Sequence, residues 1–297
     1  MGKIAFVFSG QGDQFPGMGK ELYDKYSAAA EIFKMCDEIR PGTSAQCFGG
    51  SEEELKETAN TQPCLFAMEL AAASVLSSKG IRADAAAGFS LGEVTAVTYA
   101  GIFDAKTGFS LVCRRGELMQ REAEKFDTSM AAVVKLSDRE VEELCGKYPQ
   151  IYPVNFNCPG QVTVSGLSER MPEFFADVKS AGGRAIPLKV KGAFHSPFMD
   201  GAAADFAEVL SKAEASRGNI TVYSDFTAQP YGDNAAELLS RQICSPVRWE
   251  RVVRNMIEDG ADTFVEIGPG ATLCNMIKKI SGEVKAYTVT DYLAEVE

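Results

Sequence analysis

Two residues of this chain have the types that nucleophilic catalysis needs. Ser90 lies at the centre of Gly88-Phe89-Ser90-Leu91-Gly92, a G-x-S-x-G pattern typical of a serine held on a sharp strand-to-helix turn. His195 is the only histidine of the 297 residues, so any imidazole chemistry must use it. A serine hydroxyl is a weak nucleophile until a neighbouring base takes its proton. The two residues therefore predict an acyl-transfer site with Ser90 as nucleophile and His195 as base.

Each of these residues also has an ordinary interpretation. Glycines can simply bound a turn, and a lone histidine is more often a surface or core residue without chemistry. A strand before Ser90 and a helix after it are both predicted, and this context favours the nucleophile. Leu91 opens that helix, so its backbone N–H is an expected donor to an oxyanion.

Arg115 is predicted to lie on an apolar face of a helix. Its neighbours three and four residues away are Leu111, Val112, Leu118 and Met119. A guanidinium buried there is costly unless an anion meets it. Two interpretations stay open: an internal ion pair with a carboxylate, or a bidentate grip on a substrate carboxylate. The adjacent Arg114 faces Ser110 and Glu117 and is predicted to point to solvent.

The glycine-rich segment 9–20 does not match a nucleotide-binding loop. Gly19-Lys20 is followed by Glu21 rather than by serine or threonine, and Phe15 occupies the third glycine position of G-x-G-x-x-G. The glycines are instead expected to let the backbone pass close to a substrate.

Composition excludes several classes of partner and site. A net charge of −11 and a pI near 4.8 argue against nucleic acid or an anionic membrane as the main partner. No apolar stretch has the length of a membrane span, and the first ten residues predict a strand rather than a signal peptide. Eight scattered cysteines without a C-x-x-C pair, beside one histidine, provide no usual zinc spacing. We expect reduced, mostly structural thiols in a cytoplasmic protein without metal or cofactor.

The elements that would position these residues alternate in the first third of the chain. Strands are predicted at Ile4–Phe8 and Ala83–Ala87. Helices are predicted near Gly19–Ala30, at Thr61–Ser78 with Gln62-Pro63 at its start, at Leu91–Ala100, and from Asp104 to about Lys125. Such alternation favours an α/β layer with a parallel sheet.

The middle of the chain predicts a β-α-β-β-α-β order. Its elements are Met130–Leu136, Asp138–Lys147 with Ser137 as cap, Ile151–Asn157, Gln161–Ser165, Glu169–Ala181 and Ala185–Val190. This is the ferredoxin-like order, predicted as an insert at 128–191 within a main domain made of 1–127 and 192–297. His195 follows the insert directly, so we expect the site in the cleft between the two domains.

The last third is predicted to return to alternating elements. Strands are expected at Ile220–Ser224 and Thr263–Ile267, and helices at Pro197–Ala215, Asn234–Cys244, Pro246–Asp259 and Ala271–Ile280.

In order along the chain, these motifs resemble those of the malonyl-CoA:acyl carrier protein transacylases and the acyltransferase domains of fatty acid and polyketide synthases. The matching segments are Phe8-Ser9-Gly10-Gln11-Gly12 with Gln14, Gly88-Phe89-Ser90-Leu91-Gly92-Glu93, Arg115-Gly116 with Met119-Gln120, Asn157-Cys158-Pro159-Gly160-Gln161-Val162, Gly192-Ala193-Phe194-His195-Ser196, Pro246-Val247-Arg248-Trp249 and Glu266-Ile267-Gly268-Pro269-Gly270.

The resemblance implies an α/β-hydrolase-like core with a ferredoxin-like insert, and a serine–histidine dyad that uses no cofactor. Ser90 would be acylated, His195 would be its base, and Arg115 would grip the malonate carboxylate. The amides of Gln11 and Leu91 would form the oxyanion hole. A main-chain carbonyl near Pro246–Trp249 would orient the histidine.

The resemblance also implies the partners, namely malonyl-CoA and acyl carrier protein. Phe194 resembles the form associated with malonyl rather than branched acyl units. For carrier docking, the candidate cations are Lys189, Lys191, Lys278 and Lys279, whose ordinary interpretation is a solvated face. A monomer is expected, and the absence of attached synthase modules favours fatty acid over polyketide synthesis.

Two positions depart from the family pattern. Residue 89 is Phe where His is usual, and residue 9 is Ser where Pro is common. Ser90 is expected to stay active, while Phe89 is expected to alter the acyl pocket or the pantetheine channel. Two other functions stay open: a serine esterase or thioester hydrolase, and a non-catalytic carrier-protein binding module.

Overall fold

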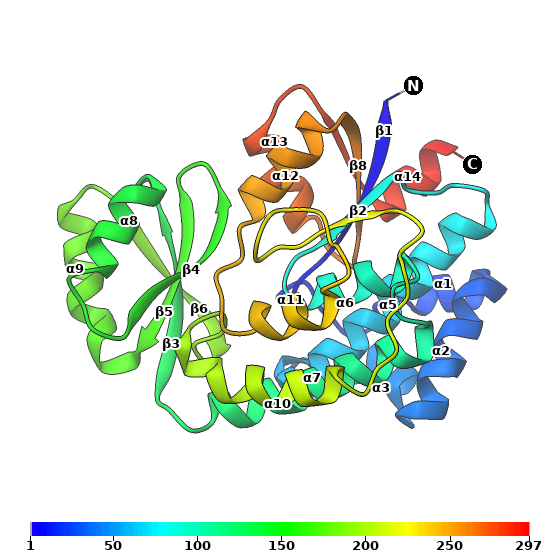
Figure 1. The fold of residues 1–297 in the computed structure, drawn as a ribbon, viewed down its shortest axis with the longest axis horizontal. Helices are drawn as coiled ribbons and strands as arrows, with labels where there is room; N and C mark the ends of the chain where they lie inside the picture. The colour runs from blue at the N-terminus through cyan, green and yellow to red at the C-terminus, as the bar shows by residue number, and fades with distance from the viewer. Residues whose placement is uncertain (1, 297) are drawn as a thin grey trace.

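The computed structural model describes residues 2–296, apart from the side chain of Lys191. Its strands form two sheets, one of five strands and one of four. Figure 1 shows the four-stranded sheet with α8 and α9 on the left and the five-stranded sheet, surrounded by the remaining helices, on the right.

The five-stranded sheet is parallel throughout, as predicted for the core. In spatial order it consists of β7 (Thr221–Tyr223), β2 (Ala85–Gly88), β1 (Lys3–Phe8), β8 (Ala261–Ile267) and β9 (Lys285–Thr288). Alternate residues of β1 enter different cores: Phe6 and Phe8 join one apolar cluster, Ala5 and Val7 the other. Both faces of the sheet are therefore buried, as parallel sheets require.

Helices cover both faces of this sheet. They are α1 (Lys20–Lys25), α2 (Ser27–Ile39), α3 (Thr43–Gly49), α4 (Glu52–Lys56), α5 (Thr58–Ser78), α6 (Leu91–Tyr99), α7 (Ala105–Ala123), α10 (Asp200–Leu210) after the 3-10 turn η2 (Pro197–Met199), α11 (Ala235–Gln242), α12 (Trp249–Glu258), α13 (Thr272–Ile280) and α14 (Val289–Val296). The longest, α5, is buried on nearly every side, as expected for a helix that is apolar all round.

The four-stranded sheet is antiparallel and lies within residues 128–191. In spatial order it consists of β4 (Ile151–Cys158), β5 (Gln161–Leu167), β3 (Thr128–Val134) and β6 (Arg184–Lys191), with helices α8 (Asp138–Cys145) and α9 (Met171–Ser180) and the short turn η1 (Ser168–Arg170). The predicted β-α-β-β-α-β order is confirmed. Val141 and Phe174 belong to its separate apolar core, while the division into domains at 127/128 and 191/192 stays a prediction.

Local capping agrees with the sequence at α8 and α7. Ser137 and Glu140 form a reciprocal capping box at the start of α8. Asp104 caps α7 by accepting from the backbone N–H of Thr107.

Two helices were predicted with the wrong bounds. The helix expected near Gly19–Ala30 is two helices, because Tyr26 has an extended backbone with φ −128° and ψ 124°. The helix expected from Thr61 begins at Thr58, so Pro63 lies inside it rather than at its start. A proline in the second turn removes one backbone hydrogen bond, and the burial of this helix outweighs that loss.

Other predictions erred at element ends or missed short elements. The helix expected over Pro197–Ala215 ends at Leu210, and the one expected from Pro246 begins at Trp249. The elements α3, α4, β9 and α14 were not predicted. All eight cysteines carry free thiols. Within residues 2–296, no helix is both long enough and apolar enough to cross a bilayer.

Candidate active site

Ser90 lies on a sharp turn between β2 and α6. Its backbone has φ 56° and ψ −107°, a strained conformation for a residue with a side chain. The flanking glycines are required by close packing. A Cβ at position 88 would lie 1.9 Å from the carbonyl carbon of Gly92, and a Cβ at position 92 would lie 2.3 Å from the carbonyl oxygen of Phe8. The G-x-S-x-G pattern thus has a steric cause and holds the serine at the carboxyl end of the sheet.

The Ser90 hydroxyl lies in hydrogen-bonding contact with the imidazole of His195. Ser90 Oγ and His195 Nε2 are 2.7 Å apart. On the other side of the ring, Nδ1 lies 2.9 Å from the main-chain oxygen of Gln242. A carbonyl can only accept, so Nδ1 carries the hydrogen and Nε2 is free to accept from the serine. This arrangement has the tautomer that a general base needs.

His195 is itself held in an unusual backbone conformation. Its φ is 61°, and its backbone N–H donates to Ile243 over 3.1 Å. Burial, together with the nearby charge of Arg115, lowers the pKa of His195 to about 4. The ring is therefore neutral at neutral pH.

The carbonyl that orients the histidine lies shortly before the segment named for it. The expectation was a carbonyl near Pro246–Trp249, and the acceptor is Gln242, four residues before Pro246. Gln242 ends α11, and carbonyls in the last turn of a helix lack intrahelical partners. No carboxylate contacts the imidazole within the described part of the chain. A dyad completed by a main-chain oxygen fits this geometry.

Arg115 is completely buried in the same site. Its guanidinium donates to Gln62 Oε1 over 2.8 Å, to Gln242 Oε1 over 2.7 Å and to Ser90 Oγ over 3.3 Å. Its Nε has no hydrogen-bond partner, and no carboxylate among residues 2–296 forms an ion pair with it. Burial lowers the pKa of Arg115 to about 10, so it remains cationic at neutral pH. The internal ion pair is absent, and the guanidinium keeps capacity for an incoming anion.

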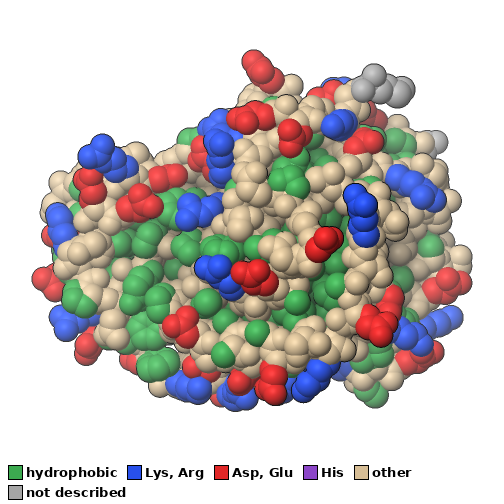
Figure 2. Space-filling model, in the orientation of Figure 1, with side chains coloured by type: hydrophobic (Ala, Val, Ile, Leu, Met, Phe, Trp, Pro, Cys, Tyr) green, Lys and Arg blue, Asp and Glu red, His purple; other side chains and the backbone are tan. Residues whose placement is uncertain are grey.

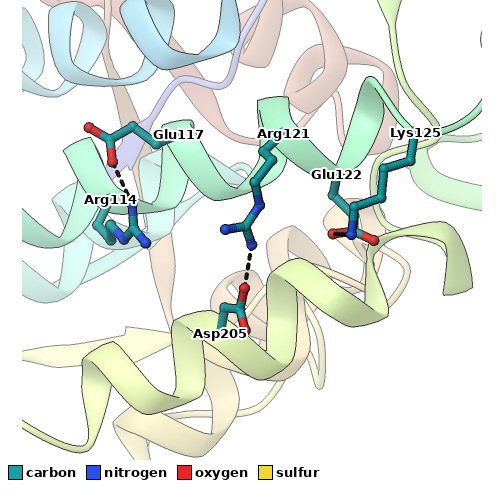
Figure 3. Close-up of polar contacts among 6 residues, drawn as sticks. All are labelled: Arg114, Glu117, Arg121, Glu122, Lys125 and Asp205. Carbon is teal, nitrogen blue, oxygen red and sulfur yellow. Dashed lines mark hydrogen bonds and ion pairs between the residues drawn. The ribbon is translucent and has the colours of Figure 1, made fainter.

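Figure 3 shows ion pairs at other positions of α7. Arg114 lies 2.8 Å from Glu117, which confirms its predicted solvent-side position. Arg121 pairs with Asp205 of α10. Arg114 and Arg115 are thus neighbours in sequence with opposite environments, which makes Arg114 a matched control for Arg115.

Two backbone amides lie at the carboxyl ends of adjacent strands. Phe8 of β1 pairs with Gly88 of β2, so the segments leading to Gln11 and Leu91 leave the sheet side by side. Leu91 is the first residue of α6. Neither the Gln11 nor the Leu91 backbone N–H has an acceptor within residues 2–296, so both could donate to a bound oxygen. The side-chain amide of Gln11 reaches Thr58 Oγ1 over 3.5 Å.

Phe194 is 8% exposed and belongs to the large apolar core that also contains Leu118 and Met119. Phe89, the residue before the nucleophile, packs edge-on against Trp249 with ring centres 5.6 Å apart.

A cavity of about 260 Å³ lies between the β1 loop and the four-stranded sheet. Its lining joins Gln11 and Phe89 to side chains of the second sheet, including Asn155, Asn157 and Leu188. The Oδ1 atoms of both asparagines are buried without a hydrogen-bond partner. The cavity therefore has two amide side chains in its wall next to the Ser90 turn, and their oxygens are covered from solvent.

On the outer face shown in Figure 2, apolar side chains gather over and beside the four-stranded sheet, and no histidine is visible. The edge strand β6 carries two exposed apolar side chains, Ile186 and Leu188, which are 39% and 38% exposed. Among the described side chains, no cluster of three or more metal-binding types is arranged to hold a metal ion.

Sequence reasoning missed four residues that organise the site. Gln62 and Gln242 hold the guanidinium of Arg115, while Glu93 and Asp225 lie beneath the serine. Glu93 follows the G-x-S-x-G pattern directly, which was the one available signal. The other three come from separate segments, and single polar residues carry no periodic pattern.

Comparison with known proteins places the chain in a family. The model of the acyl transferase domain matches residues 5–293. A Bacillus subtilis protein named malonyl CoA-acyl carrier protein transacylase is 37% identical over 98% of this chain and 94% of its own length. A Synechocystis protein of the same name is 37% identical over 93% of each chain.

Solved structures agree with this assignment. A malonyl CoA-acyl carrier protein transacylase from Clostridium perfringens superposes with a TM-score of 0.95, at 33% identity over 99% of this chain and 97% of its own. A malonyl-transacylase solved in complex with a type II PKS acyl-carrier protein superposes with a TM-score of 0.95, at 32% identity over 99% and 98% of the two chains. The predicted fold class is thereby confirmed, and the chain belongs to the acyl transferase domain family, among the malonyl CoA-acyl carrier protein transacylases.

Proposed function

We propose that this chain transfers a malonyl group from malonyl-CoA to the phosphopantetheine thiol of acyl carrier protein through a Ser90 acyl-enzyme. The observation that carries the proposal is the 2.7 Å contact between Ser90 Oγ and His195 Nε2 beside the buried guanidinium of Arg115. The reaction belongs to fatty acid or polyketide synthesis. The relatives that bear the malonyl transacylase name support the assignment of substrate and carrier.

In the first half-reaction Ser90 becomes acylated. His195 Nε2 takes the hydroxyl proton as Ser90 Oγ attacks the malonyl thioester carbonyl. The backbone N–H groups of Gln11 and Leu91 donate to the oxyanion that forms. The intermediate collapses with cleavage of the carbon–sulfur bond, and the imidazolium returns its proton to the sulfur of CoA.

The second half-reaction runs the same steps with a different thiol. The phosphopantetheine thiol of the carrier loses its proton to His195 and attacks the acyl-Ser90 carbonyl. Collapse releases malonyl-carrier, and the imidazolium returns its proton to Ser90. Exchange of one thioester for another is nearly isoenergetic, so the cycle needs no ATP.

Arg115 selects the substrate by its free carboxylate. The guanidinium is held by neutral amides and keeps an unpartnered Nε, so a carboxylate can pair with it without displacing another anion. A hydrogen bond to a charged group contributes about 1.5–3 kcal/mol. Phe194, beside the catalytic histidine, forms part of the apolar wall that favours an unbranched acyl unit.

The pantetheine arm of both substrates passes along the cavity beneath the second sheet. Its two amide groups would hydrogen-bond to the amide side chains of Asn155 and Asn157 in the lining, and its methyl groups would pack against Phe89 and Leu188. Phe89 narrows this channel without taking part in proton transfer.

The chain works as a monomer in the cytoplasm, with neither nucleic acid nor membrane as partner. The carrier docks through local cations rather than through long-range attraction, because the net charge here is −11. Lys189, Lys278 and Lys279 are exposed candidates. The side chain of Lys191 lies outside the described part of the chain.

A transfer assay distinguishes this function from hydrolysis. Purified protein is incubated with malonyl-CoA, with and without holo acyl carrier protein, and malonyl-carrier and free malonate are both quantified. We expect malonyl-carrier to form faster than malonate. Malonate released faster than malonyl-carrier would favour the thioester hydrolase and reject the transferase.

A further inference from the structure

Two carboxyl groups lie completely buried beneath the Ser90 turn. Glu93 is in the first turn of α6, and Asp225 follows β7 closely in the chain. Asp225 Oδ2 accepts from the backbone N–H of Ser90 over 2.7 Å. No lysine or arginine among residues 2–296 forms an ion pair with either carboxyl group. A buried carboxylate without a cationic partner is energetically costly, so these two groups are not expected to carry a full negative charge each.

Gln242 connects these carboxyl groups to the reacting residues. Its Nε2 donates to Ser90 O over 2.6 Å and to Glu93 Oε2 over 2.7 Å, and it lies 3.2 Å from Asp225 Oδ2. Its Oε1 accepts from Arg115 over 2.7 Å. The neutral side-chain amide of Gln242 therefore lies between the two carboxyl groups and the guanidinium of Arg115. A direct ion pair would occupy the donors that the substrate carboxylate needs.

The charges balance only if one carboxyl group is neutral. Two carboxylates and one guanidinium would leave a net negative charge in a site with no water-exposed carboxyl oxygen, and Asp225 Oδ1 would have no hydrogen-bond partner. The two groups lie close together, because the backbone N–H of Asp225 donates to Glu93 Oε1 over 3.3 Å and Gln242 Nε2 lies within 3.2 Å of an oxygen of each carboxyl group. Burial raises the pKa of both groups, and the negative charge of Glu93 raises the pKa of Asp225 further. Two carboxyl groups this close do not both ionise.

We propose that Asp225 and Glu93 share one proton, which Asp225 Oδ1 carries and donates to Glu93. Anionic Glu93 then accepts from Asp225, from the Tyr231 hydroxyl and from Gln242. The pair presents one negative charge, which balances Arg115. Asp225 is a positioning residue: it fixes the Ser90 backbone and sets the charge beneath it.

The neighbouring ionisable groups have fixed states around neutral pH. Arg115 on α7 is cationic, and burial near Glu93 raises the pKa of Tyr231 far enough to keep it protonated. His195 is neutral. Arg248 donates only its backbone N–H to Asp225 O, while its side chain lies over the ring of Phe156. Below the pKa of Arg115, which is about 10, the shared proton is thus the charge that changes as the solution becomes alkaline.

Loss of this proton has a consequence for the proposed function, on which this part of the inference rests. A group whose pKa is raised keeps its proton at neutral pH and loses it as pH increases. The second negative charge would then oppose both the malonyl carboxylate at Arg115 and the oxyanion at Ser90. Transfer of malonyl should therefore fall on the alkaline side, and transfer of acetyl should fall less.

Isotope-edited infrared spectroscopy tests the proton directly. Protein labelled with ¹³C in its aspartate carboxyl groups should show the carbonyl band of a protonated acid at pH 7. The band should disappear in Asp225→Asn and persist in Asp13→Asn, a matched control because burial also raises the pKa of Asp13. Absence of the band, or its survival in Asp225→Asn, would overturn the proposal whether or not the protein transfers malonyl.

A kinetic comparison separates the charge from a structural role. Asp225→Asn keeps an oxygen for the Ser90 N–H and offers an N–H to Glu93, whereas Asp225→Ala removes both. We expect kcat/KM at pH 7 to be roughly 5–150-fold lower in Asp225→Ala than in Asp225→Asn, because Asp225→Ala leaves the buried Ser90 N–H without an acceptor. The part of the alkaline fall that lies below the pKa of Arg115, about 10, should disappear in Asp225→Asn. Superimposable pH profiles of the native protein and Asp225→Asn would overturn the proposal.

Discussion

The two sheets of this protein differ in what they contribute to the site. The parallel sheet carries Ser90 after β2, Gln11 after β1 and Asp225 after β7, all at its carboxyl edge. The antiparallel sheet contributes lining side chains such as Asn155 and Asn157, and its strand β6 leads into the loop that carries His195. Figure 1 shows the two sheets beside one another, with the site elements on the parallel side.

The difference follows from strand direction. In a parallel sheet every strand delivers its following loop to one edge, so residues far apart in sequence converge there. In an antiparallel sheet alternate loops leave at opposite edges, and the shared feature is a face. The account therefore predicts that substitutions at the parallel edge change kcat, while substitutions on the antiparallel face change KM. The predictions below run from the largest effect to the smallest.

The largest effect is expected at the base. His195→Ala should lower the rate of Ser90 acylation by about 10²–10⁴-fold, which is the usual contribution of a positioned general base. Rapid-quench measurement of acyl-enzyme formation checks this. Near-native acylation in this variant would reject His195 as the general base.

The second effect separates two neighbouring arginines. Arg115→Ala should lower kcat/KM for malonyl-CoA by roughly 10–150-fold, corresponding to about 1.5–3 kcal/mol for a charge-assisted contact. Acetyl-CoA has no free carboxylate, so its smaller activity should change much less. The matched control is Arg114→Ala, which removes a 46% exposed side chain paired with Glu117 and should leave both activities unchanged. Equal losses for malonyl and acetyl would remove the assigned role of Arg115.

The loss of acylation activity in acid should occur at a lower pH than the ordinary pKa of histidine would give. The folded-state pKa of His195 is about 4, so acylation should stay constant from neutral pH to about pH 5 and fall with a midpoint near 4. An unfolded histidine titrates near 6.5, so stability present above that pH should decrease as pH falls from about 6.5 to about 4. Stopped-flow acylation and thermal unfolding across this range measure both. A kinetic midpoint near 6.5 would contradict the buried environment.

The smallest effect is expected on the antiparallel face. Asn157 donates its side-chain N–H to Thr163 over 3.1 Å and keeps its Oδ1 unpartnered. Asn157→Ala should raise KM for malonyl-CoA by about 2–10-fold, the value of one hydrogen bond of about 0.5–1.5 kcal/mol, with little change in kcat. A large fall in kcat without a change in KM would show that this face does more than bind.

The sequence predicted the reacting residues better than their supports. Ser90 was found because steric crowding forces glycine at positions 88 and 92, and that requirement is local. Arg115 was found because helical spacing reveals a charge on an apolar face. Gln242 was missed because its contacts with His195, Arg115 and Glu93 depend on where α11 ends in the folded chain. The carbonyl that orients His195 was placed four residues too late for the same reason.

The fold likewise contains elements that the sequence pattern predicts and elements that it does not. Long buried elements such as α5, the strand β1 and the strands of the antiparallel sheet follow from apolar patterning. The break at Tyr26 and the short helices α3 and α4 have too few residues to show a period. The neutral amides and buried acids of the site belong to tertiary contacts, which single-residue patterns do not encode.

Intact-protein mass spectrometry with peptide mapping tests the central claim most directly. Protein is exposed to malonyl-CoA, methylmalonyl-CoA and acetyl-CoA, and the adduct is located. The account predicts one malonyl group on the peptide that contains Ser90, more malonyl than methylmalonyl or acetyl adduct, and no adduct in Ser90→Ala. A native protein that stays unmodified by malonyl-CoA, or that carries malonyl on a different residue, would contradict it.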